Sequence, residues 1–350
     1  MRALSEKLLN WYNSNKRDLP WRHTSDPYAI LVSEIMLQQT RVDTVISYYH
    51  QFLERFPTAA SLALAQEDEV LNLWKGLGYY SRARNLHKAA KLILHEHQGK
   101  FPSNFEQVRK LPGVGDYTAG AVMSIAFNLP FPAVDGNVSR VITRINGIDS
   151  DIALPETKSL ITDIVKQMIP SEHSGDFTQT LMELGATVCF PTTPLCDKCP
   201  VLSDCRANKE QKTELLPVKQ KKQKPQIQSF YALLLLDGQK LLMTRSHLGT
   251  LLKNLWGVPL IERESIGETP AEKLQRQILD KTGIEVLSFQ AMGKVKHVFT
   301  HRIWEMEILS CSECSIHELK QEYQWISLEA IEELPIPTAF TKLLRAGGLG

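Results

Sequence analysis

The hydrophobic pattern of the 350-residue chain changes its period near residue 229, and this change constrains the fold more than any other feature. Up to about residue 207, apolar residues recur three or four positions apart, which is the spacing of half-buried helices. One face of the segment 134–145 collects Val134, Val138, Val141, Ile142 and Ile145. Ser103 followed by Glu106 predicts a capping box at the start of another helix. We therefore predict an all-α domain over residues 1–208.

The pattern beyond residue 229 is that of strands. An apolar run at 230–236 ends in Asp237-Gly238 and precedes a second run at 239–244, which predicts two strands joined by a tight turn. Further strands are predicted at 284–292, 295–300 and 302–309. The chain is thus expected to be multidomain, with an α+β domain over residues 229–350 following the helical one.

The stretch between the two domains, residues 209–228, is rich in Lys and Gln and poor in apolar residues, which predicts a linker. Seven Lys and Arg residues lie between Arg206 and Lys224, and two acidic residues oppose them. A basic tract of this kind suits a nucleic-acid partner, and it suits a solvated linker equally well.

The composition is that of a globular protein, with 43% hydrophobic and 23% charged residues. These proportions exclude a disordered, collagen-like or coiled-coil chain. No apolar stretch approaches the roughly 18 residues that a membrane-spanning helix needs. The first residues lack the continuous apolar core of a secretory signal, so we expect a cytoplasmic protein.

Four of the six cysteines lie within 17 residues, in the spacing Cys-x6-Cys-x2-Cys-x5-Cys. In a chain without a secretory signal, clustered thiols predict metal binding rather than disulfides. Four thiolates in one loop suit a 4Fe–4S cluster or a zinc ion, and ligand rules leave that choice open. The other two, Cys311 and Cys314, supply two ligands without an evident third and are interpreted as part of an ordinary strand or loop.

A glycine-bearing turn, LPGVG at residues 111–115, lies between two predicted helices. Gly113 and Gly115 let the chain turn sharply and leave backbone N–H groups exposed at the start of the second helix. Such a turn binds phosphate without a positive side chain. It predicts a helix-hairpin-helix that contacts a DNA backbone, with a simple glycine turn as the alternative.

Two carboxylates stand out by position. Glu34 is the only charged residue between Tyr28 and Thr40. If it is buried, its pKa is raised and it can hold a proton near neutrality, as a general acid must; a surface-facing side chain is the alternative. Asp135 stands at a helix start, where it either caps the helix or faces a cleft in which positive charge develops.

Together and in order, the LPGVG turn, the VDGNVSR segment around Asp135 and the cysteine loop resemble the helix-hairpin-helix superfamily of DNA glycosylases, which has the endonuclease III fold. The resemblance covers roughly residues 1–210. It implies one 4Fe–4S cluster, with the ligands Cys189, Cys196, Cys199 and Cys205.

One position indicates the branch of this superfamily. Bifunctional members carry a lysine nucleophile where this chain has Tyr117, and without an amine no Schiff base forms. Tyr117 and the segment SEIMLQQT resemble the adenine DNA glycosylases of the MutY type, which remove adenine mispaired with 8-oxoguanine. The resemblance implies a monofunctional enzyme in which Glu34 protonates adenine N7 and Asp135 stabilises an oxocarbenium-like sugar, supported by Tyr117 and Asn137. We expect it to act on duplex DNA as a monomer.

The same resemblance indicates which residues contact DNA. The adenine pocket is expected to contain Trp21, Arg22 and Gln179. The residues expected to enter the duplex and contact the opposite base are Gln39, Thr40, Leu77 and Tyr79. Core packing is the alternative for Leu77 and Tyr79, and similarly for the residues of the LPWR segment.

The second domain resembles the Nudix fold, which in this branch recognises the oxidised guanine. In an alignment with the Nudix hydrolase box, the acidic positions hold Gln277, Asp280 and Lys281, while Glu268 remains. A lysine in place of a metal ligand predicts that the domain has lost the metal site and hydrolase activity.

A tripeptide in the second domain, Phe299-Thr300-His301, matches the Phe-Ser-His that is usual in adenine DNA glycosylases. In that branch the serine contacts the oxidised guanine. Thr300 keeps the hydroxyl and adds a methyl group, so the resemblance implies that the contact is retained.

Two alternatives remain at this point. One is another mismatch or damaged-base glycosylase on the same scaffold. The other is a non-catalytic DNA-binding or iron–sulfur protein that has kept only the fold. The presence of both Glu34 and Asp135 favours an enzyme.

Overall fold

The computed structural model describes residues 2–219, 225–245, 252, 254–263, 271–299 and 301–349. The chain divides into two compact units. The first consists of Met1–Glu67 and Ser81–Lys221, and the second of Asp68–Tyr80 and Lys222–Gly350. Within the described ranges, no helix combines the length and apolar character needed to span a membrane.

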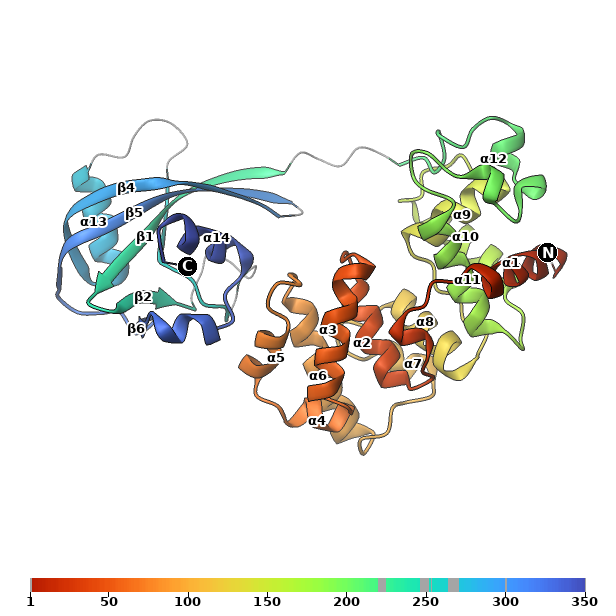
Figure 1. Ribbon diagram of the computed structural model, residues 1–350, viewed down its shortest axis with the longest axis horizontal. Coiled ribbons are helices and arrows are strands. Elements are labelled where there is room, and N and C mark those ends of the chain that lie inside the picture. The colour runs from red at the N-terminus through yellow and green to blue at the C-terminus, as the bar shows by residue number, and fades with distance from the viewer. Residues whose placement is uncertain are drawn as a thin grey trace. The chain divides into compact units, whose positions relative to one another are not determined.

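The first unit is built from helices (Figure 1), which confirms the all-α prediction. They are α1 Arg2–Asn15, α2 Pro27–Leu37, α3 Val42–Arg55, α4 Ala59–Leu64, α6 Ser81–Glu96, α7 Phe105–Arg109, α8 Asp116–Phe127, α9 Gly136–Asn146, α10 Pro155–Met168, α11 Ser174–Thr187 and α12 Arg206–Lys209. The helix α5, Glu67–Leu73, lies at the boundary and continues into the second unit.

Side-chain caps set where several of these helices begin. The Asp26 carboxylate accepts a hydrogen bond from the Tyr28 N–H, and Pro27 occupies the first position of α2. Asn104 caps α7 by accepting from the N–H groups of the second and third helical residues. The predicted capping box of Ser103 and Glu106 is therefore wrong. The capping residue is Asn104, one position later, because its side-chain oxygen accepts hydrogen bonds from both of these N–H groups.

One hydrophobic core cluster of the first unit lies between α1, α9, α10 and α11. The apolar face predicted for 134–145 is confirmed, since its members from Val138 to Ile145 are buried against α10 and α11. Gly185 of α11 comes so close to α9 that a Cβ there would lie 2.6 Å from the Cβ of Asn137. This close approach places the first turn of α9 against α11, where the candidate site is found.

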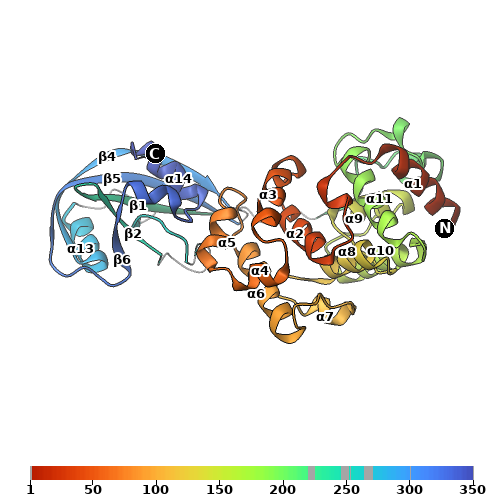
Figure 2. The same cartoon turned by 60° about the horizontal axis from the view of Figure 1, so that its bottom comes forward.

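The second unit contains a mixed sheet, seen from two directions in Figures 1 and 2. Its strand order is β4-β5-β1-β2-β6, with β3 paired to β1, and among these pairs only β1 and β5 run parallel. The elements are β1 Gln226–Asp237, β2 Lys240–Thr244, β3 Leu260–Glu262, α13 Ala271–Thr282, β4 Ile284–Val298, β5 Arg302–Ile316, β6 Tyr323–Ser327 and α14 Thr338–Ala346. The α+β prediction is confirmed.

Burial on both faces explains why the run 230–236 is apolar without alternation. Leu233 and Leu235 belong to a cluster that includes Leu274 and Ile278 of α13. The neighbouring residue Phe230 contacts Trp304 at a ring distance of 5.1 Å, and Trp304 contacts Phe340 of α14 at 6.4 Å. Helices on two sides thus remove the solvent-facing positions that would otherwise be polar.

The structure differs from the sequence prediction in several strands. The strands expected at 284–292 and 295–300 form one strand, β4, which is irregular near Gly293, where φ is 155°. The strand expected at 302–309 extends to Ile316 and therefore includes Cys311 and Cys314. The short strands β3 and β6 were not expected, since three to five residues carry little periodicity.

The stretch predicted as a linker, 209–228, is held by hydrogen bonds at both ends. Leu216 is buried at 3% exposure, and its carbonyl accepts a hydrogen bond from Arg144. At the other end β1 already begins at Gln226. An apolar residue near the start of the stretch is thus buried, whereas Ile227 near its end pairs in the sheet and is 61% exposed.

Candidate active site

Glu34 lies on a helix that is buried on all sides. From Tyr28 to Met36 every residue of α2 is buried, and Glu34 is 5% exposed. It faces a pocket of about 600 Å³ in the first unit. Burial raises the pKa of Glu34 to about 7, with a smaller contribution from the charge of Asp135. The expected general acid therefore has the environment that such a role requires, and its surface alternative is wrong.

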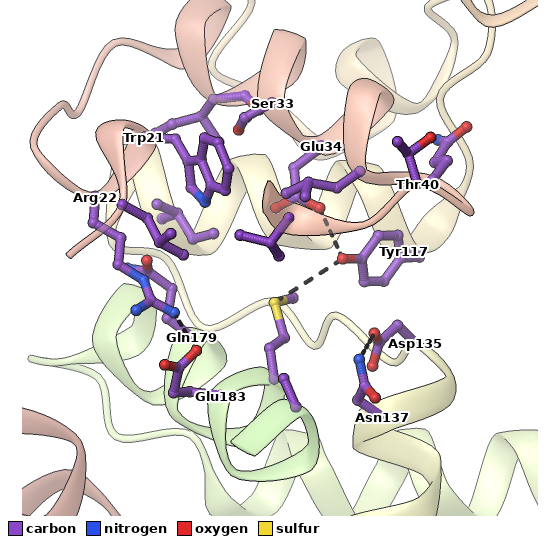
Figure 3. Close-up of a pocket in the computed structure, with 18 of the residues that line it drawn as sticks. Trp21, Arg22, Ser33, Glu34, Thr40, Tyr117, Asp135, Asn137, Gln179 and Glu183 are labelled. Atoms are coloured by element: carbon purple, nitrogen blue, oxygen red, sulfur yellow. Dashed lines mark hydrogen bonds and ion pairs between the residues drawn. The ribbon is translucent and has the colours of Figure 1, made fainter. Parts of the chain in front are cut away.

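Tyr117, in the first turn of α8, donates a hydrogen bond to Oε2 of Glu34 at 2.8 Å. This bond favours the ionised carboxylate and limits the upward shift of the Glu34 pKa. Burial and the nearby Glu34 raise the pKa of Tyr117 well above its ordinary value, so the phenol keeps its proton. Figure 3 shows Tyr117 between Glu34 on one side of the pocket and Asp135 on the other.

Asp135 both caps a helix and lines the pocket. As the N-cap of α9, it accepts a hydrogen bond from the Val138 N–H at 2.7 Å through Oδ1. Its second oxygen, Oδ2, accepts from the Asn137 side chain at 3.0 Å, and the residue lines the pocket. Burial raises the pKa of Asp135, while these hydrogen bonds and the charge of Arg140 oppose the rise.

The orientation of the Asn137 amide is set by Arg140, one turn further along α9. Arg140 donates to Oδ1 of Asn137 at 2.9 Å, which leaves the amide NH₂ facing Asp135. The same guanidinium donates to the carbonyl of Gly185 at 2.8 Å and to that of Cys189 at 2.7 Å. Arg140 was not expected from the sequence, where it looks like an ordinary helical arginine.

The predicted base-binding residues line the same pocket, which contains Trp21, Arg22, Gln39, Thr40 and Gln179. Trp21 is buried and packs edge-on against Tyr49. The Nε atom of Arg22 is buried and has no hydrogen-bond partner among the described residues.

An ion-pair cluster on the pocket wall was missed by the sequence analysis. Glu183 of α11 accepts from Arg22 at 2.7 Å and from Arg17 at 2.8 Å, and its side chain is 1% exposed. Burial by itself would raise the pKa of Glu183, but the hydrogen bonds from the two arginines outweigh it and lower the pKa to about 2. The partners lie more than 160 positions apart, so no local pattern could have revealed them.

The loop that follows α2 is held by another unexpected residue, Arg82. This buried guanidinium donates to the carbonyls of Ile35, Met36 and Gln38, at 2.6 to 3.0 Å, and to the Thr40 hydroxyl at 3.1 Å. It thereby satisfies carbonyls that the end of α2 leaves without helical partners. Gln39 adopts a left-handed conformation there, with φ of 59°. The positions of Gln39 and Thr40 thus depend on Arg82.

Leu77 and Tyr79 belong to the second unit and do not line this pocket. Leu77 is buried, in agreement with the core-packing alternative, whereas Tyr79 is 46% exposed with φ of 49°. In the LPGVG turn, Gly113 has φ of 80°, and a Cβ there would lie 2.7 Å from the Cβ of Asn85. Gly115 immediately precedes α8, as a helix-hairpin-helix requires.

Phe299 follows the end of β4, and His301 precedes the start of β5. Phe299 packs against Trp304 at a ring distance of 5.0 Å, and His301 is exposed. Thr300 lies outside the described residues, as does Glu268 of the Nudix box. Lys281, which stands in an acidic position of that box, donates to the carbonyl of Leu260 at 2.7 Å.

The four clustered cysteines line one hollow beside α9. Arg144 donates to Sγ of Cys189 at 3.3 Å and to the carbonyls of Phe190 and Pro191. Burial, with smaller contributions from the neighbouring thiols, raises the pKa of the Cys199 thiol to about 11. No three of the described His, Cys, Asp or Glu side chains are placed to hold a single metal ion. Four converging sulfurs next to a guanidinium are a donor set that fits a larger, anionic iron–sulfur cluster.

Comparison with known proteins identifies the family. Residues 32–167 match the HhH-GPD superfamily of base excision DNA repair proteins, and residues 231–346 match the NUDIX domain. The adenine DNA glycosylase of Homo sapiens is 33% identical, over 98% of this chain and 73% of its own length. That of Buchnera aphidicola subsp. Baizongia pistaciae is 32% identical, over 97% of this chain and 95% of its own. The chain belongs to the adenine DNA glycosylase family.

Solved structures agree with this assignment for the helical part of the glycosylase. A thermostable thymine-DNA glycosylase is 32% identical with a TM-score of 0.56, covering 59% of this chain and 96% of its own. An endonuclease III in a non-covalent DNA complex is 24% identical with a TM-score of 0.51, covering 60% and 95%, and shows the shared fold alone. The resemblance to helix-hairpin-helix glycosylases is thereby confirmed, and the glycosylase is an enzyme of base excision repair.

Proposed function

We propose that the enzyme hydrolyses the N-glycosidic bond of adenine mispaired with 8-oxoguanine or guanine in duplex DNA, without cutting the strand. The observation that carries this proposal is a buried carboxyl with a pKa of about 7, Glu34, in one pocket with a second carboxylate, Asp135. Enzymes that break a glycosidic bond usually use two carboxyl groups in different environments, since one donates a proton and the other stays ionised.

The adenine reaches this pocket by leaving the base stack. A glycosidic bond inside a duplex is inaccessible to side chains, so glycosylases rotate the nucleotide out of the helix. The flipped base is held between Trp21, Arg22 and Gln179. Glu183 keeps the Arg22 guanidinium in place.

Glu34 then protonates N7 of the adenine, which makes the base a better leaving group. With a pKa of about 7, a substantial fraction of Glu34 carries its proton at neutral pH. Tyr117 orients the carboxyl by its hydrogen bond to Oε2. As the bond to the base breaks, positive charge develops on the sugar, and the Asp135 carboxylate stabilises it.

The absence of strand cleavage follows from the residue at position 117. A lyase step needs an amine that forms a Schiff base with the sugar aldehyde, and Tyr117 offers a phenol that keeps its proton. Water therefore completes the reaction and leaves an abasic site.

The cysteine loop is assigned to one 4Fe–4S cluster held by Cys189, Cys196, Cys199 and Cys205. A bound cluster would link the two ends of the loop that packs on α9 through Arg140 and Arg144. Its chemistry is not needed for hydrolysis of the glycosidic bond.

Recognition of the oxidised guanine is assigned to the second domain and to the wedge residue Tyr79. The exposed side chain of Tyr79 suits insertion into a duplex, and Thr300 is the residue proposed to contact the oxidised base. We propose that the enzyme acts as a monomer in the cytoplasm, with domain limits at 1–208 and 229–350.

A single-turnover assay tests this function. Duplexes with adenine opposite 8-oxoguanine, guanine, thymine or cytosine, and one with thymine opposite guanine, are quenched with and without hot alkali. Scission only after alkali, fastest opposite 8-oxoguanine, is the expected result. Thymine release would instead favour the activity named for the solved thymine-DNA glycosylase. Thr300→Ala is expected to weaken the preference for 8-oxoguanine, and Thr300→Ser to retain it.

A further inference from the structure

We propose that a second hollow of the first unit, next to the active site, binds the phosphodiester backbone beside the flipped adenosine, with Lys158 and Lys219 contacting the phosphates. This inference rests on the proposed function. The hollow has a volume of about 670 Å³ and is lined by α8, α9, α10 and the start of the segment that leaves the helical unit.

The hollow is continuous with the active site. The hollow shares Tyr117, Val134, Asp135 and Gly136 with the pocket that holds Glu34. Asp135 thus stands in the wall between two cavities. With the base in one cavity and the sugar facing Asp135, the backbone attached to that sugar continues past this wall into the other cavity.

The lining of the hollow carries positive charge. Lys158 of α10 and Lys219 both line the hollow, and neither forms an ion pair with any residue that the structure describes. The Ser139 hydroxyl lines it as well, and so does Thr162, whose hydroxyl donates to the carbonyl of Lys158 at 2.8 Å. Cations and hydroxyls on one concave surface are the usual partners of phosphate oxygens.

The acidic groups of the hollow do not cancel these cations. Asp116 lies at its edge and forms an ion pair with Arg109 at 3.5 Å. Asp135, in the shared wall, is engaged by Val138 and Asn137. The charges of the two lysines are therefore available to a ligand in the hollow.

Backbone contacts of the residues that precede Lys219 hold this lysine at the hollow. The carbonyl of Val218 accepts a hydrogen bond from the Ile152 N–H at 3.1 Å, and the carbonyl of Leu216 accepts from Arg144 at 2.9 Å. The basic tract, interpreted from the sequence as either a linker or a nucleic-acid contact, thus includes a lysine that lies beside the active site.

The test compares the full-length variant Lys158→Ala/Lys219→Ala with the control Lys166→Ala/Lys209→Ala. The control removes the same charge from exposed lysines of α10 and α12 that do not line the hollow. Binding is measured by fluorescence anisotropy at several salt concentrations. The probe is a duplex with 2′-fluorinated adenosine opposite 8-oxoguanine, which resists cleavage because fluorine disfavours the oxocarbenium ion.

In the test variant, the slope of log Kd against the logarithm of the salt concentration is expected to decrease by about 2, since each phosphate contact contributes about 0.9 to this slope. In the control variant, the slope is expected to stay near the wild-type value. Lys158→Arg/Lys219→Arg should restore the slope. Equal slopes in test and control variants would overturn the proposal.

Neutral methylphosphonates that replace the phosphates flanking the adenosine show where the two lysines contact the DNA. They should weaken binding by the wild type much more than binding by the test variant, because the lysines and the phosphates act as pairs. Equal weakening in both proteins would place the lysines elsewhere on the DNA and overturn the proposal. Because binding is measured separately, failure of the wild type to release adenine would count against the proposed function alone.

Discussion

The hydroxyl of Tyr117 donates a hydrogen bond of 2.8 Å to a carboxyl oxygen of Glu34, and both groups are buried in the wall of one pocket. Burial raises the pKa of Glu34 to about 7, and this hydrogen bond restrains the rise. The pair therefore controls how much of the acid form is present at neutral pH.

Glu34→Gln is expected to reduce the single-turnover rate of adenine release by at least about 100-fold, the usual contribution of a general acid. Binding to the mismatched duplex should remain, because the amide keeps the shape of the carboxyl. Rates from rapid quench and affinities from anisotropy check the two parts, and an active variant would show that another group supplies the proton.

The same variant is expected to be more stable than the wild type at pH 8 and not at pH 4. The folded-state pKa of Glu34 is about 7 against an ordinary 4.5, so the wild type loses stability as the pH rises between these values. At about 1.4 kcal/mol per pKa unit, the loss is on the order of 3 kcal/mol. Urea unfolding at the two pH values measures it, and a pH-independent difference would contradict the burial of an ionisable carboxyl.

Tyr117→Phe should move the pH profile of the chemical step to higher pH. The phenol favours the ionised carboxylate, so its removal raises the pKa of Glu34 further above 7. In the wild type the rate should fall above about pH 7, by roughly tenfold per pH unit, because the acid form is required. Single-turnover rates between pH 5.5 and 9 compare the two proteins, and a profile that stays in place would remove Tyr117 from this role.

Tyr117→Lys is expected to introduce strand cleavage in the absence of alkali. An amine at this position can attack the sugar aldehyde and form a Schiff base. Borohydride should trap a covalent protein–DNA complex from the variant and none from the wild type. Tyr117→Phe serves as the control without an amine.

Glu183→Ala should destabilise the fold and impair binding of the adenine. The substitution leaves Arg22, whose side chain is 9% exposed, without its carboxylate partner. Breaking a buried pair from one side typically costs about 3 kcal/mol or more. The matched control is Glu6→Ala, which removes the exposed pair with Arg2 and should change the unfolding free energy by less than about 1 kcal/mol. Similar losses in both variants would mean that the Glu183 cluster is not a buried pair.

Much of the candidate site could be predicted because its residues lie in short contiguous motifs. Glu34 stands out in an apolar helix, Asp135 at a helix start and Gly113 in a tight turn, since each is marked by its immediate neighbours. Tyr117 was identified by a resemblance to known motifs rather than by local physics. The change from helical to strand periodicity likewise indicated two kinds of domain.

Other features were decided only by the tertiary structure. Arg82, Arg140 and Glu183 find their partners on helices remote in the chain, and a charged residue in a helix has the same local pattern whether it is solvated or buried. The hollow lined by Lys158 and Lys219 likewise exists only where α8, α9 and α10 meet. The sequence by itself determined the local conformation and the chemically distinctive residues. The buried ion pairs and the second cavity arise from long-range packing, which leaves no periodic trace in the chain.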